Sequence, residues 1–330
     1  MSHRRFWIAV GASLLLFLVT LAVTPLIGSS DAELSRAWAG VSPDKEILFQ
    51  VRLPRVLLAA LAGGALALAG VVFQSLLRDA LATPYTLGVQ SGAALGAVIA
   101  ICFGWSTIGA FPAVWVSGFI GATLTIMVVV GISSERRRMS SFTLLLTGVT
   151  INSICMAAIL FLHYTAGFTQ SFAIVRWLMG GIDSMEYKTL ATLSVGIGAG
   201  LVFAMVKANE LNLLAVGEDW AATRGVHLSS LMLSCYLLGS FLTASITSLT
   251  GPIGFIGLIV PHALRLVVGA DHRLLVPTSF CVGGTFLMLC DTLARTALAP
   301  SEIPVGVMTA MIGGPFFIWL LRSNRRGLWV

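Results

Sequence analysis

The chain has 330 residues, of which 57% are hydrophobic and 10% charged, and its formal net charge is +6. Soluble domains carry about 25% charged residues, so this composition excludes a soluble enzyme. The basic residues form no face interleaved with aromatic side chains, which argues against a nucleic-acid-binding protein and leaves a polytopic membrane protein.

Apolar runs of transmembrane length recur along the whole chain. About 20 helical residues cross a hydrocarbon core of about 30 Å, so these runs predict an all-α membrane protein with about ten transmembrane helices. The third and eighth runs are too short to cross upright, and backbone beside them must face protein or a wet cavity. The expected spans are 6–27, 53–77, 91–104, 112–132, 142–163, 189–206, 231–250, 254–268, 274–298 and 304–321.

The distribution of basic residues predicts the topology. An even number of spans places both termini on one side, and that side then holds 13 of the 20 Lys and Arg residues. Because positive charge concentrates in cytoplasmic loops, both termini are expected in the cytoplasm of a multi-pass protein of the cytoplasmic (inner) membrane.

Small residues follow helix-packing spacing in two places. Gly88, Gly92 and Gly96 form a GxxxGxxxG run, and Gly63 and Gly70 lie on the second span with Ala67 between them. Helices in lipid associate through close backbone contact, which small residues allow. These positions are interpreted as packing surfaces that carry no information about a substrate.

The two halves of the chain share a weak pattern. In each half, a long span is followed by a Gly/Pro-containing break and then a short span, once around Pro84 and once around residues 251–254. Inverted repeats with broken helices are common in transporters, so the fold is expected to have inverted-repeat character.

Three arginines stand on the side where positive charge is disfavoured. Arg52 and Arg55 precede or begin the second span, and Arg295 lies near the outer end of the ninth, one turn after Asp291. One interpretation pairs Arg295 with Asp291 and places the other two in lipid headgroups. The other is a positive surface that docks an acidic partner, for which the arginine fork is well suited.

The longest cytoplasmic loop, residues 207–230, contains an amphipathic stretch at 211–226. We expect two short helices there, joined at Gly217 and ended at Gly225 by a left-handed cap. This pair could lie in the headgroups or insert into a cytoplasmic protein, and composition does not separate the two.

Signatures of catalysis are absent from the sequence. None of the three lysines lies in a GxxxxGK[ST] phosphate loop, and the five histidines have no metal-ligand spacing. We therefore expect no enzymatic activity, no cofactor and no metal site in this chain. Asp291 is the one acid within an expected span, and its closeness to Arg295 favours a local ion pair over an ion-transport site.

Five motifs in order give the chain a family resemblance. It resembles the permease subunits of ABC importers for iron-siderophore complexes, haem and cobalamin (type II importers with ten helices per subunit), across essentially its whole length. The motifs are RLPR at 52–55, LGVQSGA at 87–93, AVGE at 215–218 with RG at 224–225, GFIGLIVPH at 254–262 and EIPVG at 302–306.

This resemblance implies a transport mechanism and its partners. Residues 1–330 would form one transmembrane permease domain that pairs with a second permease subunit within the lipid bilayer, in a homodimer or, as the alternative, a heterodimer. Two cytoplasmic ATPase subunits would power import, and a periplasmic or lipid-anchored binding protein would deliver the substrate. The pathway would be wide and mostly apolar, so specificity would reside in the binding protein.

The resemblance also assigns roles to residues of this sequence. Arg52, Arg55 and Arg295 would meet acidic residues of the binding protein. The turn between the fourth and fifth spans, Ser140, Ser141 and Phe142, would form the cytoplasmic gate, although Phe142 departs from the small polar residues usual there. ATPase coupling falls to Leu211, Leu214, Gly217, Glu218, Ala221, Arg224 and Gly225.

Two other classes of membrane protein remain as rivals. A secondary transporter driven by an ion gradient would need acids or histidines on several spans, and a membrane enzyme would need His, Asp and Glu clustered at one depth. The sequence offers essentially Asp291 alone for either purpose.

Overall fold

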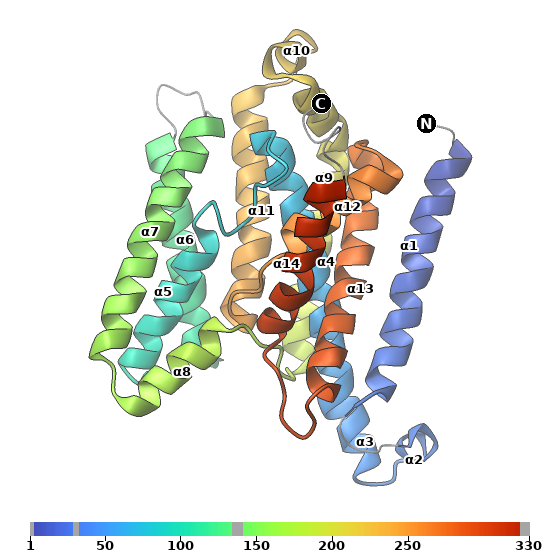
Figure 1. The fold of residues 1–330 in the computed structure, drawn as a ribbon, viewed down its shortest axis with the longest axis vertical. Helices are drawn as coiled ribbons and strands as arrows, with labels where there is room; N and C mark the ends of the chain where they lie inside the picture. Colours follow the sequence, from blue (N-terminus) through green and yellow to red (C-terminus); the bar gives the residue numbers. More distant parts are fainter. Residues whose placement is uncertain (1–2, 29–32, 134–140, 324–330) are drawn as a thin grey trace.

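Ten apolar helices make up the body of the protein in a computed structural model, which describes residues 3–28, 33–133 and 141–323 (Figure 1). Seven of the described helices are long and apolar enough to cross a membrane: α1 (His3–Val23), α4 (Leu53–Leu77), α6 (Ala113–Ser133), α7 (Ser141–Thr165), α9 (Tyr187–Val216), α11 (Leu228–Thr250) and α13 (His272–Thr296). The three shorter apolar helices are α5 (Val89–Cys102), α12 (Ile256–Val268) and α14 (Val305–Ser323). The predicted all-α membrane fold is therefore confirmed, with seven helices of spanning length and three shorter apolar helices among the described residues.

Short elements connect these helices. They are η1 (Thr24–Leu26), α2 (Leu34–Trp38), α3 (Asp44–Glu46), η2 (Ile47–Arg52), α8 (Phe168–Leu178), α10 (Glu218–Thr223) and an antiparallel pair of two-residue strands, β1 (Thr107–Ile108) and β2 (Phe111–Pro112). At one end of the bundle α10 projects, and at the opposite end lie α2 and α3 (Figure 1). We call these the α10 end and the α2 end.

Helix α4 is the centre of the bundle. It is buried along nearly its whole length and packs against α9, α11, α12 and α13. Glycines allow the closest approaches: a Cβ at Gly63 would collide with the Gly283 carbonyl of α13, and one at Gly70 with the Gly257 carbonyl of α12. The expected packing role of Gly63 and Gly70 is confirmed, since no larger residue would fit between these backbones.

The expected glycine run before and within α5 divides into two roles. Gly92 and Gly96 lie where α5 meets α6, and a Cβ at Gly96 would collide with the Ser117 carbonyl. Gly88 is instead the residue before the helix, with a left-handed φ of 79°, a conformation that glycine adopts without steric cost.

Each expected break is present in the structure. Helix α4 ends at a left-handed Arg78, and the chain turns through Pro84 before the short α5; the long α11 ends at Gly251 (φ 70°), and the short α12 follows a left-handed Phe255 (φ 69°). Both halves therefore contain a long helix, an irregular turn and a short helix.

Two differences from the expected spans have physical causes. Helix α9 is 30 residues long and extends ten residues beyond the predicted end at 206, because Lys207 and Glu210 interrupt the apolar run but are good helix formers. They also pair with each other at 2.7 Å. Helix α8 was not predicted, since its 11 residues are too few and too polar for a span.

Candidate functional site

Two polar regions at opposite ends of the bundle contain most of the predicted site residues. Arg52, Arg55 and Arg295 lie at the α2 end, where α4 begins and α13 ends. The residues predicted for coupling lie at the α10 end, where α9 passes into α10 (Figure 1). Helix α4 runs between the two regions.

At the α2 end, Asp291 joins two of the predicted arginines. Its Oδ1 accepts from Arg55, whose Nη2 lies 3.0 Å away, and its Oδ2 accepts from Arg295 Nε at 3.0 Å. Glu302 completes this group with an Oε2 2.8 Å from Arg55 Nη1. We call Arg55, Asp291, Arg295 and Glu302 the Asp291 network.

Burial divides the Asp291 network into an inner and an outer part. Asp291 has no exposed surface and Arg295 is only 4% exposed, whereas the Arg55 side chain is 12% and the Glu302 side chain 46% exposed. Arg295 also donates to the Ile27 carbonyl at 3.2 Å and to Thr292 Oγ1 at 3.3 Å. A buried carboxylate between two guanidinium groups has its charge compensated.

Arg52 lies beside this network but points elsewhere. It is 5% exposed, and its Nη1 donates to the Pro25 carbonyl at 3.4 Å. Its guanidinium fills the space beside Gly28, so that a Cβ on that glycine would overlap it. The structure thus places all three predicted arginines at the α2 end, with Arg55 the most accessible to a partner.

At the α10 end, the predicted joint and cap are present. Gly217 has φ 154° and ψ 150° between α9 and α10, and Gly225 has φ 84° just beyond α10. The expectation of two short helices was wrong in one respect: residues 211–216 are the last turns of α9, and only α10 is separate. The polar side chains at 207–210 did not end α9, since helix formers continue a helix beyond the hydrocarbon.

The coupling residues separate into an anchoring and an exposed set. Leu211, Leu214 and Ala221 are fully buried and hold α10 against α9. Trp220 is 49% exposed, and the Arg224 guanidinium lies 4.9 Å from its ring centroid. This cation–π pair forms part of the projecting surface.

Arg78 connects α10 to the central helix, and sequence reasoning did not find it. Its Nη2 lies 2.6 Å from Glu218 Oε1, and Arg78 itself is the left-handed cap of α4. Both side chains are more than a third exposed, so this ion pair adds little to the stability of the fold. Its effect is to hold α10 in one position relative to the end of α4. The sequence does show a basic residue, Arg78, directly after the second span. It does not show that Arg78 pairs with Glu218, because the two lie 140 residues apart.

A second polar group supports the last turns of α9. Asn212 Oδ1 accepts from the His272 backbone N–H at 2.8 Å, and Asn212 Nδ2 donates to Asp271 at 2.9 Å. His272 Nε2 in turn contacts Ser75 of α4. Hydrogen bonds from Arg273 hold the pKa of the Asp271 carboxyl well below its usual range, which keeps it an acceptor.

The predicted gate is only partly described. Ser141, the first residue of α7, donates to the Leu76 carbonyl of α4 at 3.0 Å. Phe142 is 72% exposed, and Ser140 lies outside the described residues. The beginning of α7 is therefore tied to the end of α4, close in sequence to Arg78.

Comparison with known proteins gives a consistent result. The family model of the FecCD transport family matches residues 14–323. The hemin transport system permease protein HmuU of Yersinia pestis is 38% identical, over 94% of this chain and 95% of its own length. The cobalamin import system permease protein BtuC of Halobacterium salinarum is 39% identical, over 84% of this chain and 74% of its own.

Two further matches widen the range of named substrates and support the fold. The molybdate import system permease protein MolB of Haemophilus influenzae is 35% identical, over 86% of this chain and 83% of its own. A solved structure described as an inward-facing conformation of a metal-chelate type ABC transporter has a TM-score of 0.84 and 31% identity, covering 96% of this chain and 99% of that one.

Proposed function

Because this chain belongs to the FecCD transport family and is an ABC importer permease, we propose that it carries an iron-siderophore complex, haem or cobalamin into the cytoplasm. The observation that carries this proposal is the match to permeases named for hemin and cobalamin over most of their length. Residues 1–330 would act as one permease domain of the inner membrane, with both termini in the cytoplasm.

In this proposal α10 is the contact with a separate ATPase. Its Trp220 and Arg224 project from the bundle, while Leu211, Leu214 and Ala221 anchor it. ATP-driven closure of two ATPase subunits would move α10, and the Glu218–Arg78 pair would pass that movement to α4. The turn at 140–142, next to the end of α4, would respond as the cytoplasmic gate.

The pathway would lie between this chain and a second copy. Helices α7 and α14 carry large apolar side chains that are more than 60% exposed, among them Phe161 and Tyr164 on α7 and Met311 and Ile318 on α14. Such faces suit lipid or a second permease subunit. A pathway between two such copies would explain why the described part of this chain offers no convergent polar site for its substrate.

The ion-driven alternative has less support. Asp291 is the acid that such a transporter would use, but it accepts from Arg55 and Arg295 at 3.0 Å. Both of its carboxylate oxygens are therefore occupied within the chain, one by Arg55 and one by Arg295.

We expect the purified chain alone, in liposomes, to show neither ATP hydrolysis nor uptake driven by a proton or sodium gradient, because the sequence has no phosphate-binding loop. Adding a partner ATPase and a substrate-loaded binding protein should produce ATP-dependent uptake of radiolabelled substrate. Gradient-driven uptake by the lone chain would refute the proposal. Comparing haemin, cobalamin and a ferric siderophore in the same assay identifies the substrate.

We also propose that the α2 end docks acidic groups of the binding protein, with Arg55 making the contact. Arg52 and Arg295 would contribute their charge from beneath, since electrostatic attraction reaches about 10 Å at 0.1 M salt. Glu302 partly offsets this charge at the surface. Replacing Arg55 and replacing Glu302, the two outer members of the Asp291 network, should therefore change the affinity for the binding protein in different ways.

Arg55→Gln should weaken binding-protein affinity by roughly 1–3 kcal/mol, the value of a hydrogen bond to a charged group. Glu302→Gln should leave it unchanged or strengthen it, because it frees Arg55. Both effects should shrink as salt rises. The measurement is the affinity of the reconstituted transporter for its binding protein at two salt concentrations. Equal affinity for both variants and the unmodified chain would mean that this network serves only the fold.

A further inference from the structure

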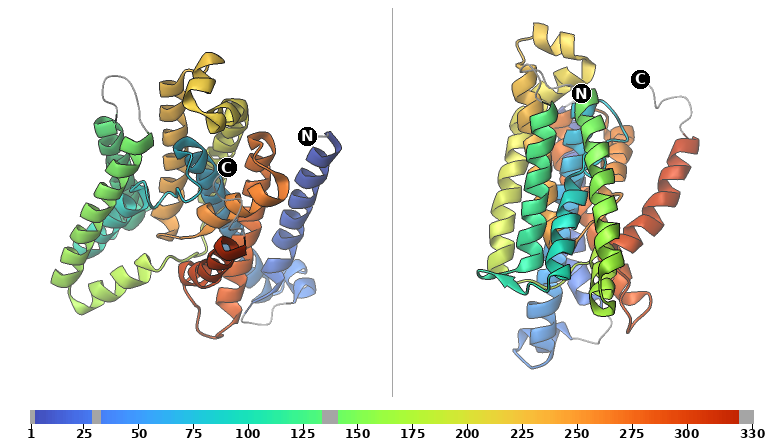
Figure 2. Two further views of the ribbon diagram at one scale, coloured as in Figure 1. Left: turned by 45° about the horizontal axis from the view of Figure 1, so that its top comes forward. Right: turned by 90° about the vertical axis from the view of Figure 1, so that its left-hand side faces the viewer.

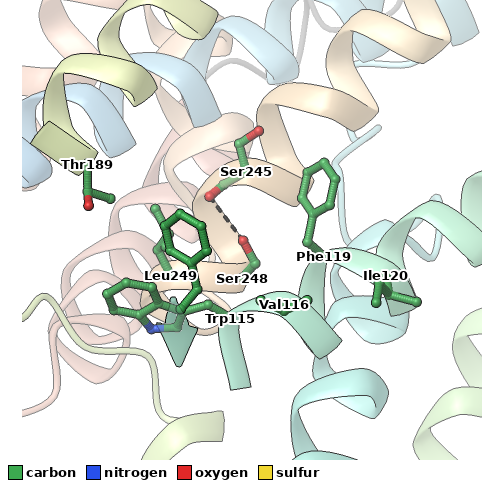
Figure 3. Close-up of a pocket in the computed structure, with 9 residues that line it drawn as sticks. Trp115, Val116, Phe119, Ile120, Thr189, Ser245, Ser248 and Leu249 are labelled. Atoms are coloured by element: carbon green, nitrogen blue, oxygen red, sulfur yellow. Dashed lines mark hydrogen bonds between the residues drawn. The ribbon is translucent and has the colours of Figure 1, made fainter. Parts of the chain in front are cut away.

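A forked groove lies on the face of the bundle formed by α6, α9 and α11, and no role assigned above uses it. Two adjoining cavities of about 300 and 430 Å³ form it. Figure 3 shows the residues that line its first cavity. One branch follows α6 to Ile120, and the other follows α9 and α11 to Gly196 and Phe241. The lining residues common to both are Phe111, Phe119, Thr189, Ser245 and Leu249.

The α9 side of the groove lies away from α14, one of the two helices assigned to the pathway. In the right-hand view of Figure 2, α9 and α14 lie at opposite edges of the bundle. Its walls are mainly apolar, with Trp115, Phe119 and Leu249 around the space in Figure 3. The Ser248 hydroxyl donates to the Ser245 carbonyl at 3.2 Å, which satisfies that polar group within its own helix. Such walls favour an apolar occupant.

Gly196 keeps the longer branch open. A Cβ there would lie 3.4 Å from Phe241 Cζ, which is an ordinary contact. The space beside Gly196 could therefore hold a side chain, and it is empty because glycine has none. From Tyr187 to Gly196 the helix rises about 13.5 Å over nine steps of about 1.5 Å each. Half of a hydrocarbon core of about 30 Å is about 15 Å deep. The branch therefore reaches through most of one leaflet.

Opposite charges stand at the mouth of this branch. Glu186 and Lys188 line the second cavity, both are exposed, and neither forms an ion pair with any residue that the structure describes. Tyr187 lies between them, and its hydroxyl donates to the Phe49 carbonyl, which fixes the start of α9. Tyr187 and Trp115 are of the type that gathers at a membrane interface, so this mouth lies at headgroup level.

We propose that the groove binds one phospholipid with a phosphoethanolamine headgroup. The phosphate would pair with Lys188, the primary ammonium would donate to Glu186, and the acyl chains would fill the two branches. A choline headgroup cannot donate hydrogen bonds to Glu186, and an anionic headgroup without an ammonium group leaves Glu186 unpaired. With the termini in the cytoplasm, this lipid belongs to the outer leaflet.

The test uses the full chain in bilayers of equimolar phosphatidylethanolamine and phosphatidylglycerol, released for native mass spectrometry. We expect one retained phosphatidylethanolamine per chain. Gly196→Leu should reduce retention about tenfold or more, because its side chain occupies the space of several acyl methylenes. Leucine also favours a helix over glycine, so the variant should fold.

Two further variants complete the test. Gly198→Leu is the matched control, since it adds the same side chain two residues along α9 at a position where nothing lies within 4 Å of a Cβ, and it should retain the lipid as the unmodified chain does. Lys188→Glu leaves the helix core untouched and should abolish the preference for phosphatidylethanolamine.

The proposal is overturned if Gly196→Leu and Lys188→Glu both retain the lipid normally, if the retained lipid is phosphatidylglycerol, or if none is retained by the unmodified chain. If the unmodified chain carried a second copy of itself in place of the lipid, and Gly196→Leu lost that copy, the groove would be an interface between proteins and the lipid proposal would be wrong. These outcomes do not depend on which substrate the permease carries.

Discussion

Replacing Asp291 with alanine is expected to destabilise the protein by about 3–5 kcal/mol, the effect of removing one partner from a buried ion pair. Arg295 would remain 4% exposed beside Arg55, and two like charges would face each other without a carboxylate between them. The measurement is denaturation of the purified protein in micelles, followed by circular dichroism, together with its yield in the membrane.

Two companion variants separate charge from packing at this site. Asp291→Asn keeps the shape and the hydrogen-bond acceptor but loses the charge, so its effect should be intermediate. The double variant Asp291→Ala/Arg295→Met removes both buried charges and should recover part of the stability, because the unpaired cation causes most of the loss. If Asp291→Ala were as stable as the unmodified protein, the Asp291 network would not hold α4 to α13.

Replacing Gly217 with valine is expected to separate ATP hydrolysis from transport in the assembled importer. The backbone there has φ 154° and ψ 150°, a combination that a β-branched residue avoids at a cost of about 1–3 kcal/mol. Nothing lies within 4 Å of a Cβ at this position, so the effect acts through the joint and not through packing. We expect hydrolysis to continue while substrate uptake falls about tenfold, the ratio that corresponds to about 1.4 kcal/mol.

The matched control is Ala215→Val, which adds the same side chain two residues earlier on an exposed position of α9. Its backbone is helical, so transport and hydrolysis should remain coupled. Normal uptake by Gly217→Val, with hydrolysis also normal, would show that the joint between α9 and α10 does not transmit movement.

The sequence carried enough information for features that depend on neighbours along one helix or one turn. The apolar runs predicted the seven helices of spanning length and the three shorter apolar helices that the structure describes, because backbone in lipid must form a continuous helix. Spacing alone predicted that Asp291 and Arg295 pair, since residues four apart meet on one helix face. It also predicted the left-handed cap at Gly225.

Other features depended on how separate helices are rotated and shifted against each other. Arg55 meets Asp291 across 236 residues of sequence, and Arg78 meets Glu218 across 140. Spacing predicted neither, because the register between two helices is determined by close packing along their whole interface, as at Gly63 against Gly283. The groove between α6, α9 and α11 has the same origin, since it exists only where three separately encoded surfaces fail to fill the space between them.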